Sequence, residues 1–184
     1  EARRRLGFDE LLNIQKILIE NSLKIKKQPA FSISLNNKSM EKIKTKLPFT
    51  LTESQDTTIE EIHNDIGKPH PMRRLLQGDV GSGKTIVALL GLLPVLENGY
   101  QVVFLAPTGI LAQQHYQSIS KLLDKKYKIS LITKETYNEL DTKSQLLIGT
   151  HAILKHKSEL IHNLAMVIID EQHRFGVEQR RELL

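Results

Sequence analysis

A phosphate-binding pattern near the middle of the chain limits what the rest can fold into. Gly78, Gly83, Lys84 and Thr85 satisfy the spacing G-x-x-x-x-G-K-[ST]. Glycines in such a loop let successive main-chain N–H groups point at a polyphosphate, and the N-terminus of the following helix adds partial positive charge. We therefore expect the whole loop to bind nucleotide phosphates: Gly78, Asp79, Val80, Gly81, Ser82, Gly83, Lys84 and Thr85.

Two side chains of this loop have specific predicted roles. The Lys84 ammonium would reach the β- and γ-phosphates, and the Thr85 hydroxyl would ligate Mg²⁺. The alternative is a glycine turn with a solvated lysine. An apolar stretch before the loop, at 73–77, and an apolar helix after it favour the nucleotide site, because a phosphate loop joins a strand to a helix.

Helical and extended segments alternate along the chain. Helices are predicted over residues 7–24, 52–66, 84–98 and 110–123, and strands over 73–77, 101–106, 128–133, 145–148 and 164–169. The last strand is apolar throughout, as is typical of a strand covered on both faces. Pro94 predicts a kink or an early end of its helix, and Gly99 is expected to close that helix. The alternation predicts an α/β fold, a mostly parallel sheet with helices on both faces.

An acidic pair follows the most apolar strand. Ligands of parallel sheets bind beyond the carboxyl ends of the strands. There, Asp170 is predicted to hold Mg²⁺ together with Thr85, and Glu171 to orient or deprotonate an attacking water. The alternative is an acidic pair that only ends a strand. His173 is more often structural when taken alone, but beside this pair a relay between nucleotide and polymer is the competing interpretation.

Gln55 has two interpretations. Thr52 and Gln55 fit a capping box that opens the helix continuing to Ile66, in which case the amide only satisfies main-chain groups. Alternatively, the Gln55 amide contacts the edge of adenine, with Phe49 packed near the base. The spacing alone favours the cap.

Composition and charge narrow the class of protein. The chain has 184 residues, a net charge of +5 and no cysteine, which fits a cytoplasmic protein and excludes disulfides and thiolate metal sites. Residues 1–50 carry eleven Lys and Arg against five Asp and Glu, so the excess charge lies in the leading segment. A basic leader suits nucleic acid or an acidic neighbouring domain, or is simply a solvated helix face.

The remaining sequence features concern the extent of the chain and the classes of protein that it excludes. The chain begins with Glu1 and not Met, so we expect a fragment of a longer protein. Residues 28–39 are predicted to be an irregular linker, and Ser39 to cap a short helix ending at Lys46. No apolar run is long enough to span a bilayer, so no membrane partner is expected. No H-E-x-x-H, downstream N-K-x-D or G-x-S-x-G pattern suggests a zinc protease, a switch GTPase or a serine hydrolase.

Taken together, the motifs resemble those of superfamily 2 DNA helicases, in particular the members that remodel branched DNA. The matching stretches are LPFTLTESQ, PMRRLLQGDVGSGKT, APTGILAQQHY, IGTHAIL and VIIDEQHRFGVEQR, in the order of that family, over residues 47–180. Gln172 and His173 favour this group over the related transcription-repair coupling translocases. The leader EARRRLGFDELLNIQ also resembles the segment that joins a DNA-binding wedge domain to the motor.

The resemblance implies a RecA-like lobe over residues 47–184, preceded by a basic helical linker over 1–46. It implies ATP and Mg²⁺ as cofactors, adenine recognition by Gln55, and a bacterial cytoplasmic enzyme. Partners would be branched DNA, a second RecA-like lobe and the wedge domain. One DNA strand would be held by its phosphates, without sequence preference, through residues after two strands: Pro107, Thr108, Gly149, Thr150 and His151.

The sequence departs from this family at two places, in addition to the unusual Pro94. Gly109 stands where the family usually has glutamate, which weakens the start of the following helix. Residues 131–136 replace a T-G-S element, so one strand contact is expected to be altered. Two hypotheses follow: the first lobe of an ATP-dependent DNA translocase, or a nucleotide-dependent binding module that remodels no strands. Stimulation of ATP hydrolysis by forked DNA distinguishes them.

Overall fold

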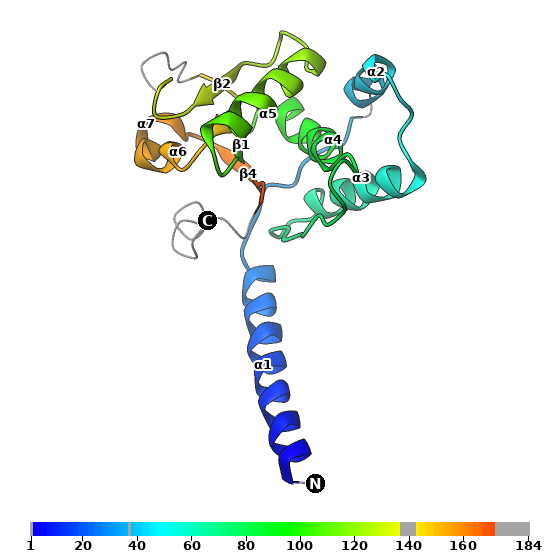
Figure 1. Cartoon of the computed structure of the whole chain (residues 1–184), viewed down its shortest axis with the longest axis vertical. Coiled ribbons are helices and arrows are strands. Elements are labelled where there is room, and N and C mark those ends of the chain that lie inside the picture. Colours follow the sequence, from blue (N-terminus) through cyan, green and yellow to red (C-terminus); the bar gives the residue numbers. More distant parts are fainter. Residues whose placement is uncertain (1, 37, 137–142, 172–184) are drawn as a thin grey trace.

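The computed structural model describes residues 2–36, 38–136 and 143–171 and contains one parallel sheet (Figure 1). Its four strands lie in the order β2-β3-β1-β4, and all neighbouring pairs are parallel. The strands are β1 (Gln101–Leu105), β2 (Ile129–Ile132), β3 (Leu146–Gly149) and β4 (Leu164–Ile169). Each coincides with a predicted strand to within two residues.

Helices cover both faces of this sheet. On one face lie α3 (Glu53–Ile66), α4 (Lys84–Glu97) and α5 (Gly109–Leu122), and on the other α6 (Ala152–Lys155) and α7 (Lys157–Leu160). Alternate residues of β1 point into two separate apolar cores, Val102 and Phe104 into the first and Val103 and Leu105 into the second. The predicted α/β class, a parallel sheet with helices on both faces, is confirmed.

The helix that follows the phosphate loop does not end at its proline. α4 continues through Pro94 to Glu97, and nearly all of its residues from Ile86 onward are buried, so the predicted early end is wrong. Burial against α3 and β1 outweighs the local penalty. Gly99 closes the helix as predicted, with a left-handed φ of 78° and its N–H bonded to the Leu96 carbonyl.

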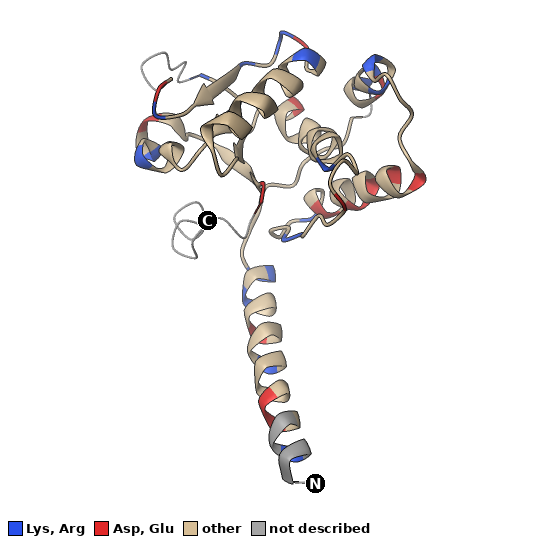
Figure 2. Ribbon diagram, in the orientation of Figure 1, with Lys and Arg blue, Asp and Glu red and all other residues tan. Residues whose placement is uncertain are grey.

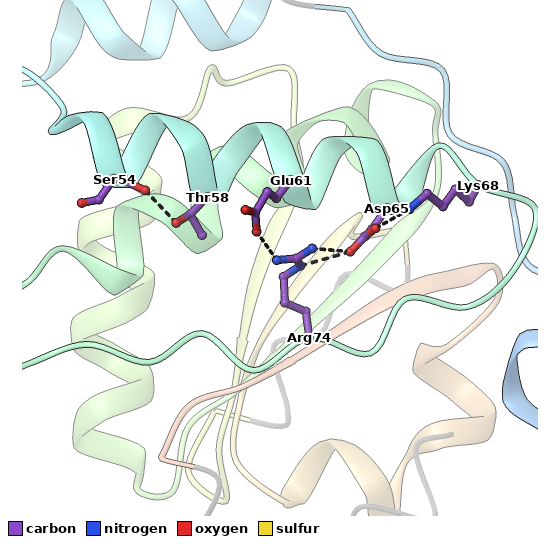
Figure 3. A network of polar contacts seen from close by, with 6 residues as sticks. All are labelled: Ser54, Thr58, Glu61, Asp65, Lys68 and Arg74. Carbon is purple, nitrogen blue, oxygen red and sulfur yellow. Dashed lines mark hydrogen bonds and ion pairs between the residues drawn. The ribbon is translucent and has the colours of Figure 1, made fainter. Parts of the chain in front are cut away.

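The predicted strand over 73–77 is not a strand in the described structure. Met72 and Leu76 pack against the first core, while Leu75 is 71% exposed. The segment pairs with no described strand. Side chains hold it instead: Arg74 forms ion pairs with Glu61 and Asp65 of α3 (Figure 3). β4 is likewise only partly covered, with intermediate burial at every position except Met166, contrary to the expectation of a strand covered on both faces.

Two helices precede the lobe. α1 (Ala2–Lys26) is longer than the predicted 7–24 and extends away from the sheet (Figure 1). Eight of its apolar side chains are more than half exposed: Phe8, Leu11, Leu12, Ile14, Ile17, Leu18, Ile19 and Leu23. α2 (Lys38–Lys46) buries Ile43 in the first core.

The start of α2 differs from the prediction. Ser39 lies inside the helix and is buried, so it is not the cap. The side chain of Asn36 accepts the Lys38 N–H instead, at 3.1 Å. No helix in the described part of the chain has the length and apolarity of a membrane-spanning segment.

Candidate nucleotide-binding site

The phosphate loop joins the extended segment 72–77 to the N-terminus of α4. Gly83 is the N-cap of α4 and has a φ of 80°, in the left-handed region. A Cβ at Gly83 would lie 2.5 Å from the Gln55 amide nitrogen. The backbone conformation favours glycine, as the motif predicts, and a larger residue would also have to displace the Gln55 side chain. Val80 is fully exposed at the tip of the loop.

Lys84 lies over its own loop. Its Nζ donates to the carbonyl oxygens of Gly78 and Asp79, at 2.9 and 2.7 Å. The ammonium is thus held on the concave side of the loop by neutral acceptors. A phosphate oxygen, which carries negative charge, makes a stronger hydrogen bond with an ammonium than a carbonyl does. The position is suitable for transfer of this lysine from the loop carbonyls to a bound polyphosphate.

Gln55 performs the predicted capping role and also contacts the loop. Its Oε1 accepts the Thr52 N–H at 2.9 Å, and its own N–H bonds the Thr52 hydroxyl, so the capping box is confirmed. At the same time its Nε2 donates to the carbonyl of Ser82 at 2.9 Å. One side chain therefore connects the start of α3 to the phosphate loop. Phe49, the predicted neighbour of the base, is 51% exposed.

The acidic pair lies at the carboxyl end of β4, where Figure 2 shows negative charge beside the sheet. The Asp170 N–H bonds the carbonyl of Leu105 at 2.9 Å, which fixes the end of β4 against β1. Glu171 is exposed and has a φ of 50°, a conformation that non-glycine residues adopt rarely and often at functional sites.

The pKa of the Asp170 carboxyl is lowered chiefly by its hydrogen bond with His115, against an opposing effect of burial. The positive charge of Lys84 also contributes to the lowering. The lysine of the phosphate loop therefore acts electrostatically on the carboxylate at the end of β4. Asp170 is consequently ionised at neutral pH, as a metal ligand must be.

His115 is the residue of this site that sequence analysis missed. Its Nε2 lies 2.8 Å from Asp170 Oδ2, and its ring packs against Phe104 at a centroid distance of 4.8 Å. His115 stands one turn after Leu111 and one turn before Ile119 on the sheet-facing side of α5. A polar residue within an apolar stripe was the only available signal, and it does not indicate which residue is the partner.

The candidate DNA-contacting residues lie at the end of β3 or shortly after β1 and β3, at the same edge of the sheet. Thr108 is exposed and caps α5, with its hydroxyl accepting the Leu111 N–H at 3.3 Å. Pro107 before it is half-buried. Thr150 differs, because it is buried and its hydroxyl accepts the Ala152 N–H. Thr108 is thus the more accessible of the two threonines.

The neighbours of Thr150 have local structural roles. A Cβ at Gly149 would lie 2.1 Å from the carbonyl oxygen of Ile132, so β2 and β3 approach each other too closely for any other residue. His151 is half-buried and is the N-cap position of α6.

The segment replacing the T-G-S element forms a tight turn in which the Thr136 hydroxyl bonds the Thr133 N–H and the Leu131 carbonyl. His173 lies outside the described residues.

The donor set fits magnesium. Thr85 offers a hydroxyl and Asp170 a carboxylate, and Mg²⁺ prefers such hard oxygen ligands. Among the described residues, no group of three or more His, Cys, Asp or Glu side chains is arranged to hold a metal. Mg²⁺ commonly uses one or two protein ligands together with phosphate oxygens and waters. The residues present therefore suit a metal that arrives with a nucleotide.

Comparison with known proteins identifies the class. The family model for DEAD/DEAH box helicases matches residues 52–184. The chain therefore belongs to the DEAD/DEAH box helicase family.

Within that class, the chain is similar to the ATP-dependent DNA helicase RecG. It is 45% identical to RecG of Aquifex aeolicus over 98% of this chain and 24% of that protein. It is 44% identical to RecG of Borreliella burgdorferi over 100% of this chain and 28% of that protein. The chain thus spans about a quarter of the length of these relatives.

Solved structures with a similar fold include members of the same helicase class. A structure of RecG bound to a three-way DNA junction superposes with a TM-score of 0.82 at 37% identity, covering 95% of this chain and 25% of that one. A DEAD box protein from Methanococcus jannaschii shares the fold, with a TM-score of 0.65 at 23% identity over 85% of this chain and 46% of that one. The resemblance seen in the sequence, and the RecA-like fold expected from it, are confirmed.

Proposed function

We propose that this chain is the first RecA-like lobe of an ATP-dependent DNA helicase that remodels branched DNA, such as stalled forks and Holliday junctions, in the bacterial cytoplasm. Similarity to RecG over nearly the whole chain supports this function, and a RecG structure contains a three-way DNA junction. Because the chain spans about a quarter of those relatives, the second lobe and the wedge domain are proposed to lie in other segments of the same protein.

The ATP site is proposed to lie between the phosphate loop and the end of β4. The observation that carries this proposal is the position of Lys84, whose Nζ lies over the phosphate loop at 2.9 and 2.7 Å from the carbonyl oxygens of Gly78 and Asp79. The lysine charge also helps to lower the pKa of the Asp170 carboxyl. Loop N–H groups and Lys84 would bind the phosphates, while Thr85 and Asp170 would hold Mg²⁺. The exposed Phe49 ring and the Gln55 amide are proposed to contact adenine.

Hydrolysis requires a positioned water. Glu171, exposed beside Asp170, is the proposed group that orients or deprotonates it, with His173 as a relay toward DNA. Bound Mg²⁺ would supply neutralisation of the charge that develops on the transferred phosphoryl group. Enzymes of this kind hydrolyse the nucleotide in a cleft between two lobes, and the second lobe supplies cationic side chains. We therefore expect the 184-residue chain alone to hydrolyse ATP negligibly.

DNA is proposed to bind along the carboxyl edge, beside the same site. Pro107, Thr108, Gly149 and His151 lie there, and Thr108 presents an accessible hydroxyl and the N-terminus of α5 to a phosphate. Thr150 is buried, so its proposed contribution is to hold the start of α6 in place. Closure of the cleft around ATP would shift these loops along one strand.

The test is DNA-stimulated ATP hydrolysis by the full-length protein. Wild type is expected to hydrolyse ATP faster with forked DNA than without it, and Lys84→Ala to abolish that activity. Lys68→Ala is the matched control, since Lys68 is a surface lysine that pairs with Asp65. Full turnover by Lys84→Ala would refute the site. Wild-type turnover that forked DNA does not raise would favour a nucleotide-dependent binding module.

A further inference from the structure

The cluster of His115, Phe104 and Asp170 is unusual for a packed α/β interface. Most apolar contacts between α5 and the sheet involve aliphatic or aromatic side chains, yet here a histidine, only 13% exposed, directs a ring nitrogen at a carboxylate. A histidine buried for structural reasons commonly bonds a main-chain carbonyl. His63 does so in this protein, with Nε2 at 3.0 Å from the Leu90 oxygen.

Both oxygens of Asp170 are fixed from within the protein. His115 Nε2 contacts Oδ2 at 2.8 Å, and the N–H of Glu171 donates to Oδ1 at 3.1 Å. Carboxylate oxygens accept hydrogen bonds, so in this contact Nε2 is the ring nitrogen that donates. Two contacts on different oxygens prevent rotation of the carboxylate about its Cβ–Cγ bond. The His115 ring also packs against the Phe104 ring, with the two rings tilted by 46°.

The carboxylate remains available to a ligand. Its side chain is 28% exposed, and each of its oxygens has lone pairs beyond those used by His115 and Glu171. We propose that His115 is a positioning residue, which holds Asp170 in the orientation needed to receive the metal ion of a bound nucleotide. The inference rests on the proposed function, because it assigns a supporting residue to the same metal position.

Hydrogen-bond partners behind a metal ligand commonly change metal affinity by about 10- to 100-fold when they are removed. The informative variants are His115→Leu, which keeps an apolar body without a donor, and His115→Gln. The Gln amide nitrogen is the same number of bonds from the main chain as His Nε2, so it can donate to Asp170. His63→Leu is the matched control, as it removes a buried histidine that has no contact with the carboxylate.

The experiment measures binding of ADP to the purified protein with and without Mn²⁺, together with the electron paramagnetic resonance spectrum of bound Mn²⁺. We expect His115→Leu to reduce the metal-dependent gain in ADP affinity about tenfold, with metal-free affinity changed less than twofold. His115→Gln should recover most of the gain and the wild-type spectrum. His63→Leu should lower thermal stability without changing the gain.

Each contrary result has a defined meaning. If the metal-dependent gain in ADP affinity is unchanged in His115→Leu, the inference is overturned. An equal loss of ADP affinity with and without metal would also overturn it. If His115→Leu does not fold, His115→Asn takes its place, because its amide is one bond too short. Equal gains in the Gln and Asn variants would then overturn the inference. Absence of any metal gain in wild type would instead contradict the proposed function itself.

Discussion

His63 Nε2 lies 3.0 Å from the main-chain oxygen of Leu90, the carbonyl that Pro94 leaves without a helical partner. In a regular helix the N–H four residues later would bond this carbonyl, but proline has none. The buried His63 side chain on α3 supplies the missing donor across the helix interface. This explains how α4 continues through Pro94 to Glu97 in spite of the proline.

The first prediction concerns the His63 side chain as the donor that replaces the missing main-chain N–H of Pro94. His63→Leu should lower the free energy of unfolding by about 1–3 kcal/mol, since it leaves the buried Leu90 carbonyl unsatisfied. In a Pro94→Ala background the loss should be smaller, because the new N–H at position 94 can bond that carbonyl. Urea denaturation of the four proteins in the cycle measures the coupling. Equal losses in both backgrounds would show that the two residues are independent.

The second prediction separates backbone strain from crowding in the phosphate loop. Gly81 and Gly83 share a φ of 80°, but a Cβ at Gly81 meets no atom within 4 Å, whereas one at Gly83 meets Gln55. Gly81→Ala should cost about 1–2 kcal/mol of stability from strain alone. Gly83→Ala should cost more, by about the value of the displaced Gln55 hydrogen bond, roughly 1 kcal/mol. Equal thermal shifts for the two variants would contradict the close approach.

The third prediction distinguishes the two contacts of Gln55. Glutamate at this position keeps an oxygen for the Thr52 N–H but has no donor for the Ser82 carbonyl. Gln55→Glu should therefore preserve most of the stability of α3 while weakening ADP binding several-fold, as expected for loss of one hydrogen bond of about 1 kcal/mol. Gln55→Ala should lose both. ADP affinity in Gln55→Glu equal to that of wild type would show that the loop contact is dispensable.

The fourth prediction concerns acid stability. The pKa of Asp65 is lowered first by its hydrogen bond with Lys68 and second by that with Arg74. A lowered folded-state pKa adds stability above the unfolded value, near 3.8, and this stability is lost as pH falls through the folded value. Arg74→Ala should therefore reduce stability at pH 6 by about 1 kcal/mol or less, and reduce the further loss between roughly pH 5 and pH 3.

Arg73→Ala is the matched control for that experiment, because Arg73 is the exposed neighbour on the same extended segment. Thermal unfolding across the pH range compares the two variants with wild type. A wild-type acid profile in Arg74→Ala would show that the Arg74 contact in Figure 3 does not lower the pKa of Asp65 in the native state.

Much of the fold could be predicted from the sequence because its signals are local. Runs such as 164–169 give strand β4 at its observed bounds, and the Thr52–Gln55 spacing gives the cap of α3. The failures depend on distant partners. The segment 73–77 is predicted to be a strand because it leads into the phosphate loop. Strand assignment needs a neighbour, however, and in the described residues the ion pairs of this segment are with α3 side chains.

In the candidate site, too, local features could be predicted and contacts with distant residues could not. The phosphate loop is recognisable because its geometry depends on glycines and a lysine within eight residues. His115 was not recognisable, since its partner Asp170 lies 55 residues away in the sequence. Likewise, nothing local distinguishes the accessible Thr108 from the buried Thr150, because burial of Thr150 follows from the packing of α6 against the sheet.

The central claim, that the phosphate loop and Asp170 hold one nucleotide–Mg²⁺ unit, is tested most directly by ADP titration with and without Mg²⁺. Wild type, Lys84→Met and Asp170→Asn are compared. The account predicts that Lys84→Met weakens binding in both conditions, whereas Asp170→Asn loses chiefly the gain that Mg²⁺ provides. A full Mg²⁺-dependent gain in Asp170→Asn would contradict it.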